Sequence, residues 1–200
     1  MKNIFKDRRS VNYFDTTKDL SEKKLKEIID TAVLAPSAFN LQPWEIIAVT
    51  SDKAKKKLQK LSMDQPKVLE APVTLIIVGD REAWNSDNKM WDKLEEIMGD
   101  QIQSRKDAAV SLYGSTEERK IKFAESHAGV LAMSIMYAAK YHEVDSHPMS
   151  AIDFEGIKKE FDLKDSQEVV MTIALGYFDK SKQLRPAGYR RGYEDIVLLV

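Results

Sequence analysis

The chain has 200 residues, of which 43% are hydrophobic and 32% are charged, and its 31 Lys and Arg nearly balance its 32 Asp and Glu. This length and composition predict one globular domain over residues 1–200, and the balanced charge argues against a nucleic-acid partner. The chain has no cysteine, which excludes disulfides and thiolate chemistry. It also has no signal-peptide core and no apolar run long enough to span a membrane, so we expect a cytoplasmic protein.

The N-terminal segment carries two adjacent arginines, Arg8 and Arg9, followed by Ser10. Guanidinium groups bind phosphate in a bidentate manner and a hydroxyl adds a neutral donor, so this segment suits a phosphate group. A solvated basic N-terminus is the alternative. A helix is then expected from its N-cap Ser21 to about Leu34, because its apolar residues recur at helical spacing.

A polar loop at residues 35–44 separates this helix from an apolar strand expected at 45–50. Pro36 stops the helix, and Pro43 restricts the other end of the loop. Between them lie uncharged donors and acceptors, such as the amide of Asn40. Such a loop suits a flat ring with polar edges, and an ordinary helix-to-strand connection is the alternative reading.

The middle of the chain alternates clear and unclear patterns. A Lys-rich helix is expected to begin at Ser51 or Asp52, and a β-branched run at 73–78 predicts a buried strand. Residues 80–117 show no clear period. We expect them to form one or two loosely packed helices that act as a variable lid over a pocket.

The last third of the chain predicts a long helix at 118–141 that is apolar nearly all round in its second half, and therefore buried. A tight polar turn is expected at 147–151, a helix at 154–161 and a strand at 168–177. The apolar C-terminus, 196–200, predicts a further strand that adds to a sheet edge of this chain or of a partner.

The chain lacks the sequence motifs of several enzyme classes. No serine elbow, GxGxxG or GxxxxGK[ST] pattern is present, which leaves triad hydrolysis, a Rossmann-type site and a P-loop unsupported. His127, on the long helix, is expected to be a hydrogen-bonded interior or interface histidine. Basic segments at both ends and uncharged polar turns between them indicate a phosphorylated cofactor that itself carries the chemistry.

Five segments, in this order along the chain, resemble the nitroreductase family of FMN-dependent oxidoreductases. They are RRSVNYF, APSAFNLQPWEIIAV, EAPVTLIIVGD, AGVLAMSIMYAAKY with DSHPMSAID, and LGYFDK with the tail RRGYEDIV. The resemblance implies an α+β fold with a mostly antiparallel central sheet flanked by helices. It also implies an intertwined homodimer that exchanges the C-terminal strand and holds two FMN molecules at its interface.

The resemblance further implies which residues bind the cofactor. Arg8, Arg9 and Ser10 would hold the phosphate and ribityl end of FMN, together with Arg190 and Arg191 of the tail. The residues implied around the flavin ring are Asn12, Pro36, Ser37, Ala38, Asn40, Gln65, Pro148, Met149, Ser150 and Ala151. The loop 36–40 would come from the partner subunit, and the segment 148–151 would lie beside the reactive nitrogen.

Asn12 stands where the family usually has a cation near the pyrimidine edge of the flavin. A neutral amide stabilises the anionic reduced ring less than a cation does, so we expect a lower flavin reduction potential than in relatives with the cation. Ser150 stands where many relatives have a glycine-containing turn, and its N–H would have to remain available to the flavin.

The implied reaction is a ping-pong transfer of hydride from NADH or NADPH to a nitroaromatic, a quinone or a similar flat small-molecule acceptor, with no side chain needed as acid or base. Two alternatives remain open at this stage. One is a reductive dehalogenase or an enzyme that uses reduced flavin with oxygen, on the same fold. The other is a non-enzymatic flavin-binding or flavin-storage protein.

Overall fold

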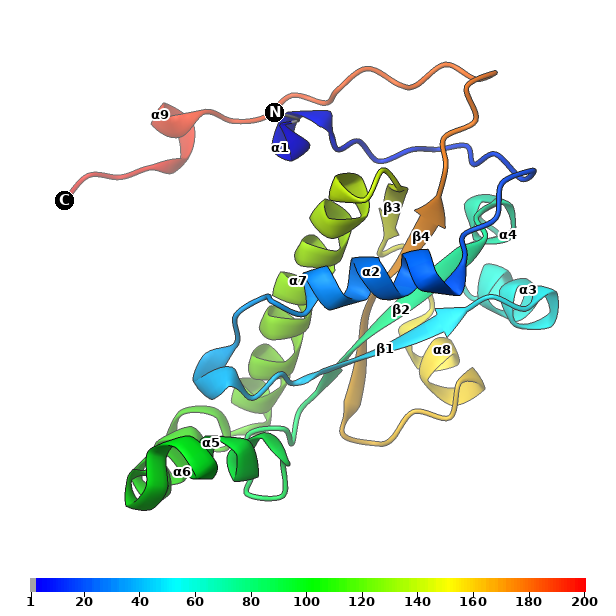
Figure 1. Ribbon diagram of the computed structural model, residues 1–200. Helices are drawn as coiled ribbons and strands as arrows, with labels where there is room; N and C mark the ends of the chain where they lie inside the picture. Colours follow the sequence, from blue (N-terminus) through cyan, green and yellow to red (C-terminus); the bar gives the residue numbers. More distant parts are fainter. Residues whose placement is uncertain (1–2) are drawn as a thin grey trace.

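The computed structural model describes residues 3–200, so the first two residues of the expected domain, 1–2, lie outside the described residues. Four strands form one antiparallel sheet in the order β1-β2-β4-β3 (Figure 1). The strands are β1 (Trp44–Val49), β2 (Val73–Asp80), β3 (Asp145–Met149) and β4 (Gln167–Gly176). The predicted α+β fold with an antiparallel central sheet is confirmed.

Helices cover both faces of this sheet. The helices are α1 (Ile4–Asp7), α2 (Glu22–Ala32), α3 (Asp52–Lys60), α4 (Lys67–Glu70), α5 (Met90–Met98), α6 (Ile102–Tyr113), α7 (Glu117–Tyr141), α8 (Phe154–Glu160) and α9 (Tyr193–Ile196). Helices α2 and α7 pack against one face, and α3, α4 and α8 cover the other (Figure 1). Within residues 3–200, no helix combines the length and apolar character needed to cross a membrane.

Strand β2 is buried on both of its faces. Leu75 and Ile77 belong to the core beneath α2 and α7, whereas Ile76 and Val78 belong to the core beneath α3, α4 and α8. Successive side chains of a strand point to opposite faces, so a strand between two helical layers needs apolar residues at every position. This explains why the sequence shows a continuous β-branched run at this point and no alternation.

The turn predicted at 147–151 is wrong for residues 147–149. Residues up to Met149 form β3, whose residue Pro148 pairs with Ile173 of β4. Because β3 is an edge strand, a proline without an N–H is tolerated there. Ser150 and Ala151 follow as exposed residues outside regular structure.

The residues of the predicted C-terminal strand form no strand within the single chain, and the predicted exchange of this strand with a partner stays a prediction. Ile196 belongs to the helical turn α9, and residues 197–200 are exposed and form no strand. The turn is capped locally, because the Asp195 carboxylate accepts from the N–H of Gly192 at 2.9 Å, as acidic side chains at a helix start commonly do. The tail leaves the end of β4 and projects away from the body of the protein (Figure 1).

Helix α7 lies close to β2 at Gly79. A Cβ built on this glycine would lie 2.8 Å from the carbonyl oxygen of Ala124 on α7, which is closer than real Cβ atoms approach. The absence of a side chain at position 79 therefore sets the distance between the long helix and the sheet.

We expect Gly79→Ala to destabilise the protein by about 1–3 kcal/mol, because the new methyl group must push α7 away from the sheet. Gly129→Ala on the same helix is the control. Nothing lies within 4 Å of its added Cβ, so it should leave stability unchanged or raise it by about 0.5–1 kcal/mol through helix propensity. Urea unfolding of both variants measures this, and equal unfolding free energies would contradict the close approach.

Candidate functional site

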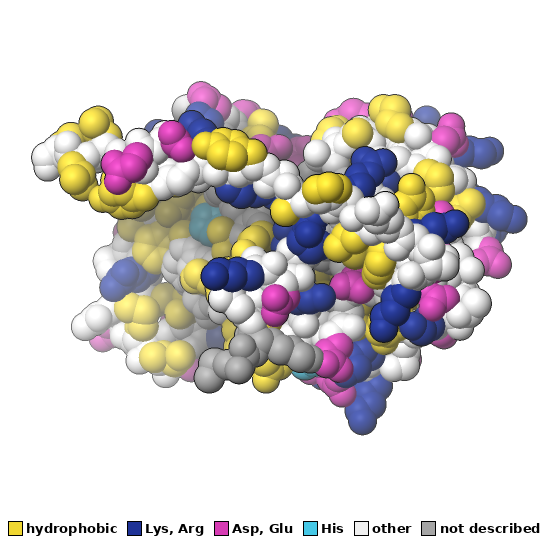
Figure 2. Space-filling model, turned by 90° about the horizontal axis from the view of Figure 1, so that it is seen from above, with side chains coloured by type: hydrophobic (Ala, Val, Ile, Leu, Met, Phe, Trp, Pro, Cys, Tyr) yellow, Lys and Arg dark blue, Asp and Glu magenta, His cyan; other side chains and the backbone are white. Residues whose placement is uncertain are grey.

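A cavity of about 460 Å³ lies between the N-terminal segment and the C-terminal tail. Its lining includes Arg8, Arg9, Ser10 and Asn12 from the N-terminal segment and Arg190 from the tail. Figure 2 looks down on this end of the molecule and shows dark-blue Lys and Arg side chains beside the base of the tail. Residues expected at the phosphate end of FMN, about 180 positions apart in the sequence, are thus brought into one cavity.

The charged side chains that line this cavity are all cationic within the described part of the chain. They are Lys6, Arg8, Arg9, Arg185 and Arg190. Like charges gathered in one concave site repel one another and create a strong positive potential. A cavity of this composition is suited to binding a multiply charged anion such as a phosphate.

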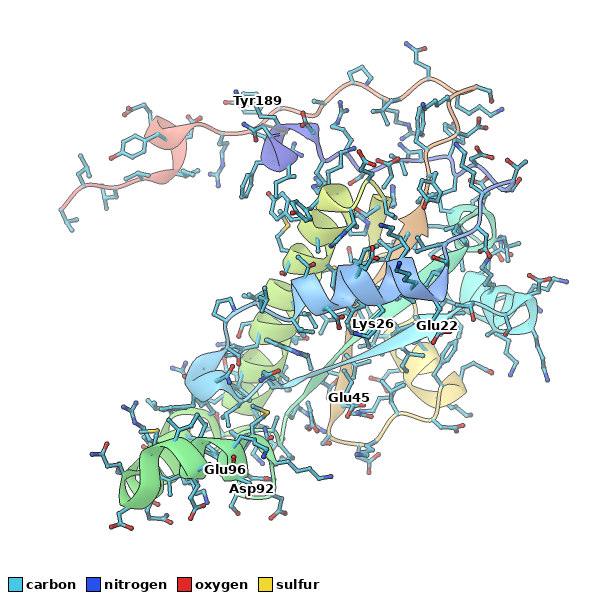
Figure 3. The ribbon with its side chains drawn as sticks, in the orientation of Figure 1. Glu22, Lys26, Glu45, Asp92, Glu96 and Tyr189 are labelled. Atoms are coloured by element: carbon cyan, nitrogen blue, oxygen red, sulfur yellow. The ribbon has the colours of Figure 1, made fainter. Side chains whose placement is uncertain are left out.

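A hydrogen bond joins the two chain ends at this cavity. The guanidinium of Arg9 donates to the carbonyl oxygen of Arg185 at 2.5 Å. Within the tail, Arg190 donates to the carbonyl oxygen of Tyr189 at 2.9 Å. In Figure 3, Tyr189 lies beside α1. Arg191, which was also expected at the phosphate, is exposed and is not among the lining residues.

A second group of the expected residues meets next to the edge strand β3. The amide of Gln65 donates to the carbonyl oxygen of Ala151 at 3.5 Å, which joins the segment before α4 to the segment after β3. Pro148 and Met149 reach this region from β3, with Met149 buried and Ser150 exposed.

His147 and Lys67 belong to the same region, and sequence reasoning had assigned neither a role. The Nδ1–H of His147 donates to the carbonyl oxygen of Val11 at 2.7 Å, next to Asn12. Burial lowers the pKa of His147 to about 4, and the positive charges of Lys67 and Arg185 act in the same direction. Burial also lowers the pKa of Lys67. Both pKa values are lowered mainly by burial, and the positive charge of Arg185 contributes to each of them as a smaller cause.

The loop that was expected to contact the flavin lies elsewhere in the same chain. Residues 36–40 connect α2 to β1 at the end of the molecule that carries α5 and α6, away from α1 and the tail (Figure 1). A single chain therefore presents two separate halves of the expected site.

This loop adopts a strained backbone. Phe39, Asn40 and Gln42 have φ values of 51°, 55° and 48°, in the left-handed region that residues with a side chain seldom occupy. The Ser37 hydroxyl accepts from the N–H of Gln42 at 2.9 Å and closes the loop, which leaves the hydroxyl hydrogen of Ser37 available to donate to a ligand. Strain of this kind is concentrated at functional sites, where surrounding contacts maintain it.

His127 on α7 anchors the loop. Its Nδ1 lies 2.7 Å from the carbonyl oxygen of Phe123, and a carbonyl only accepts, so Nδ1 carries the hydrogen. Nε2 is then the acceptor for the N–H of Ala38, at 3.0 Å. His127 is hydrogen-bonded as expected and is partly buried, and it also holds the loop in place.

Comparisons with known proteins agree with this arrangement. The model of the "Nitroreductase family" matches residues 5–177. A Bacillus subtilis protein provisionally named NAD(P)H nitroreductase MhqN is 31% identical, over 97% of this chain and 96% of its own. This chain belongs to the nitroreductase family. The family predicted from the sequence is confirmed, and with it an oxidoreductase enzyme.

Solved structures of nitroreductase-like proteins share the fold. A crystal structure of the provisionally named nitroreductase ydfN from Bacillus subtilis superposes with a TM-score of 0.92 at 30% identity, covering 98% of this chain and 97% of that chain. A provisionally named nitroreductase from Exiguobacterium sibiricum, in complex with FMN, superposes with a TM-score of 0.86 at 24% identity, covering 98% and 95%. This nitroreductase-family chain therefore has its relatives' architecture over nearly its whole length.

Sequence reasoning missed Lys67, His147 and Arg185 in this nitroreductase-family site. Lys67 stands among many lysines in the sequence, and nothing local distinguishes it. The proline that follows His147 suggested a turn, and Arg185 was seen only as part of a basic tail. Their proximity arises from the pairing of β3 with β4 and from the path of the tail, which short-range patterns do not encode.

We expect His127→Leu to release the loop. Leucine cannot accept from the N–H of Ala38, and loss of one partner of this partly buried hydrogen bond costs about 1–1.5 kcal/mol. Hydrogen exchange at the Ala38 amide should accelerate about tenfold or more, whereas His127→Gln, which keeps an acceptor, should exchange more slowly than the leucine variant. Unchanged Ala38 exchange in His127→Leu would show that other contacts hold the loop.

The depressed pKa of His147 makes stability depend on pH in a defined window. In the unfolded chain the His147 imidazole has its ordinary pKa of 6.5, whereas in the folded protein its pKa is about 4. The unfolded state therefore binds more protons between these values, so the free energy of unfolding should fall as pH drops from 6.5 toward 4. Urea unfolding of wild type and His147→Asn tests this, since the variant should lose less stability between pH 7 and pH 5.

Proposed function

We propose that this protein is an FMN-dependent oxidoreductase that takes reducing equivalents from NADH or NADPH and passes them to nitroaromatics, quinones or similar flat acceptors. The observation that carries the proposal is the cation-lined cavity between the two chain ends, whose described charged residues include no carboxylate. Membership of the nitroreductase family supports the same function.

The residues of this cavity fit the phosphate end of FMN. Arg8 is offered as a bidentate donor, and Ser10 and Asn12 supply neutral hydrogen-bonding groups, a combination that recognises phosphate and adjacent hydroxyls. Arg9 and Arg190 are partly committed to backbone carbonyl oxygens, so their contribution is mainly their charge.

The residues beside β3 fit the polar edge of the flavin ring. Gln65 offers an amide, and Lys67 offers an ammonium close enough to His147 to lower that residue's pKa. His147 donates a hydrogen bond to the carbonyl oxygen of Val11, the residue before Asn12. Lys67 therefore supplies a positive charge in the region where Asn12 lacks one, and it offsets part of the decrease in reduction potential expected from Asn12.

The complete site is proposed to require two copies of the chain. Residues 36–40 and the cationic cavity lie at different ends of one chain (Figure 1). The tail carries exposed apolar side chains, including Ile196, Leu198 and Leu199, and Figure 2 shows yellow side chains along this projecting arm. Burial of such surface favours association, so a homodimer in which the tail and the loop of one subunit reach the other accounts for both features.

When bound, FMN would supply two-electron hydride chemistry between the nicotinamide and an acceptor, in a proposed ping-pong cycle. A quinone takes up two electrons and two protons to give a hydroquinone, and a nitro group takes up the same to give a nitroso group and water. The protein's part is to bind and orient, through the arginines at the phosphate and through the loop held by His127.

We expect the purified protein to be yellow, to bleach when titrated with NADH or NADPH without oxygen, and to regain its colour when a quinone is added. Arg8→Gln should raise the FMN dissociation constant about tenfold or more, because one charge-assisted contact is lost. Arg119→Gln, an exposed arginine that does not line the cavity, is the matched control. A protein that binds FMN but is bleached by neither nucleotide would favour flavin storage, and one that binds no FMN would refute the site.

A further inference from the structure

A second cavity lies between the loop and the lid segment, residues 80–117. It has a volume of about 210 Å³ and is lined by Phe39, Asn40, Trp91, Leu94, Met98 and Arg105. Helices α5 and α6 form the lid side, and the strained loop forms the other side (Figure 1). The lining is mainly aromatic and aliphatic, with a single charged group.

Arg105 has neither an ion pair nor a hydrogen bond to its side chain within residues 3–200. The residues one turn away along the chain are uncharged, namely Gln101 just before α6 and Ile102, Ala108 and Ala109 on α6. Arg105 is exposed, so its guanidinium faces solvent and its charge is available to a ligand.

The carboxylates of the facing helix are not directed to Arg105. Glu95 pairs with Lys106 at 3.4 Å, and Glu96 pairs with Lys93 at 2.9 Å. Asp92 and Glu96, labelled on α5 in Figure 3, are not among the lining residues of the cavity. The cavity therefore combines an apolar interior with one uncompensated positive charge at its rim.

The position of the cavity ties it to the reaction. Phe39 and Asn40 belong both to its lining and to the loop that the proposed function places against the flavin. A ligand in this cavity would thus lie next to the cofactor's ring, and this step rests on the proposed function.

We propose that this cavity binds electron acceptors that combine a flat apolar body with a carboxylate or another anionic group, and that Arg105 pairs with the anion. The ring of the acceptor packs against Phe39, Leu94 and Met98, whose side chains are partly buried. Few, well-placed polar groups in an apolar pocket set ligand orientation and specificity. Arg105 is accordingly the residue that determines preference for anionic acceptors.

The test compares 4-nitrobenzoate with the neutral 4-nitrobenzyl alcohol, using kcat/KM for each in wild type, Arg105→Gln and Arg105→Lys. Wild type should prefer the carboxylate, and the ratio of the two kcat/KM values should fall about tenfold in Arg105→Gln, as expected for one lost charge-assisted contact. Arg105→Lys should recover part of the ratio, because it keeps the charge and loses the planar fork. Lys106→Gln, the adjacent cation that does not line the cavity, should keep the wild-type ratio.

A ratio that is the same in wild type and Arg105→Gln overturns the inference. Reduction of the neutral alcohol by wild type reports the proposed function separately, so the two can fail independently. A 2′-phosphate is the other anion that Arg105 could meet, and the reductive half-reaction distinguishes it. If Arg105→Gln slows flavin reduction by NADPH but not by NADH, and leaves the acceptor ratio unchanged, the anion belongs to the nucleotide and the acceptor assignment is wrong.

Discussion

The packing of α7 against the sheet is the constraint on which the other features depend. A backbone contact at Gly79 sets its distance from β2, and its small and aliphatic residues fill one face of the core. The same helix holds the loop through His127 and contributes Met133 and Tyr137 to the cationic cavity. This one helix thus positions both halves of the site, because its core-facing side is close-packed and cannot shift without disturbing those contacts. Its burial is less complete than the sequence predicted, since Val130 and Met133 are exposed in the single chain.

Both halves of the site carry features that disfavour the isolated fold. Arginines gathered without carboxylates repel one another, and three residues of the loop occupy left-handed backbone conformations. Charge repulsion and backbone strain are maintained where the surrounding structure enforces them. Binding of a ligand of complementary charge and shape offsets their unfavourable free energy. A phosphate in the first half and a flat ring beside the second are ligands of the required charge and shape.

The single chain also leaves surfaces that its own core does not cover. The tail exposes apolar side chains and forms only the short turn α9, whose capping by Asp195 is local. The tail's arginine and the loop's polar groups face different ends of the molecule. An interface between two copies, as proposed, places these surfaces in contact and makes cofactor binding and dimer formation mutually dependent.

The sequence by itself determined the elements whose pattern is local. Ser21 caps α2 as expected, and the continuous apolar run forms β2, which is buried on both faces. The paired arginines indicate an anion. Helix capping, the spacing of apolar residues and local charge each depend on residues that are close in the sequence. The tertiary structure alone decided that residues up to Met149 form an edge strand, that Ile196 joins a helical turn, and that Lys67, His147 and Arg185 meet beside Asn12. Those outcomes depend on strand pairing and on the path of the tail, which bring together residues that are distant in the chain.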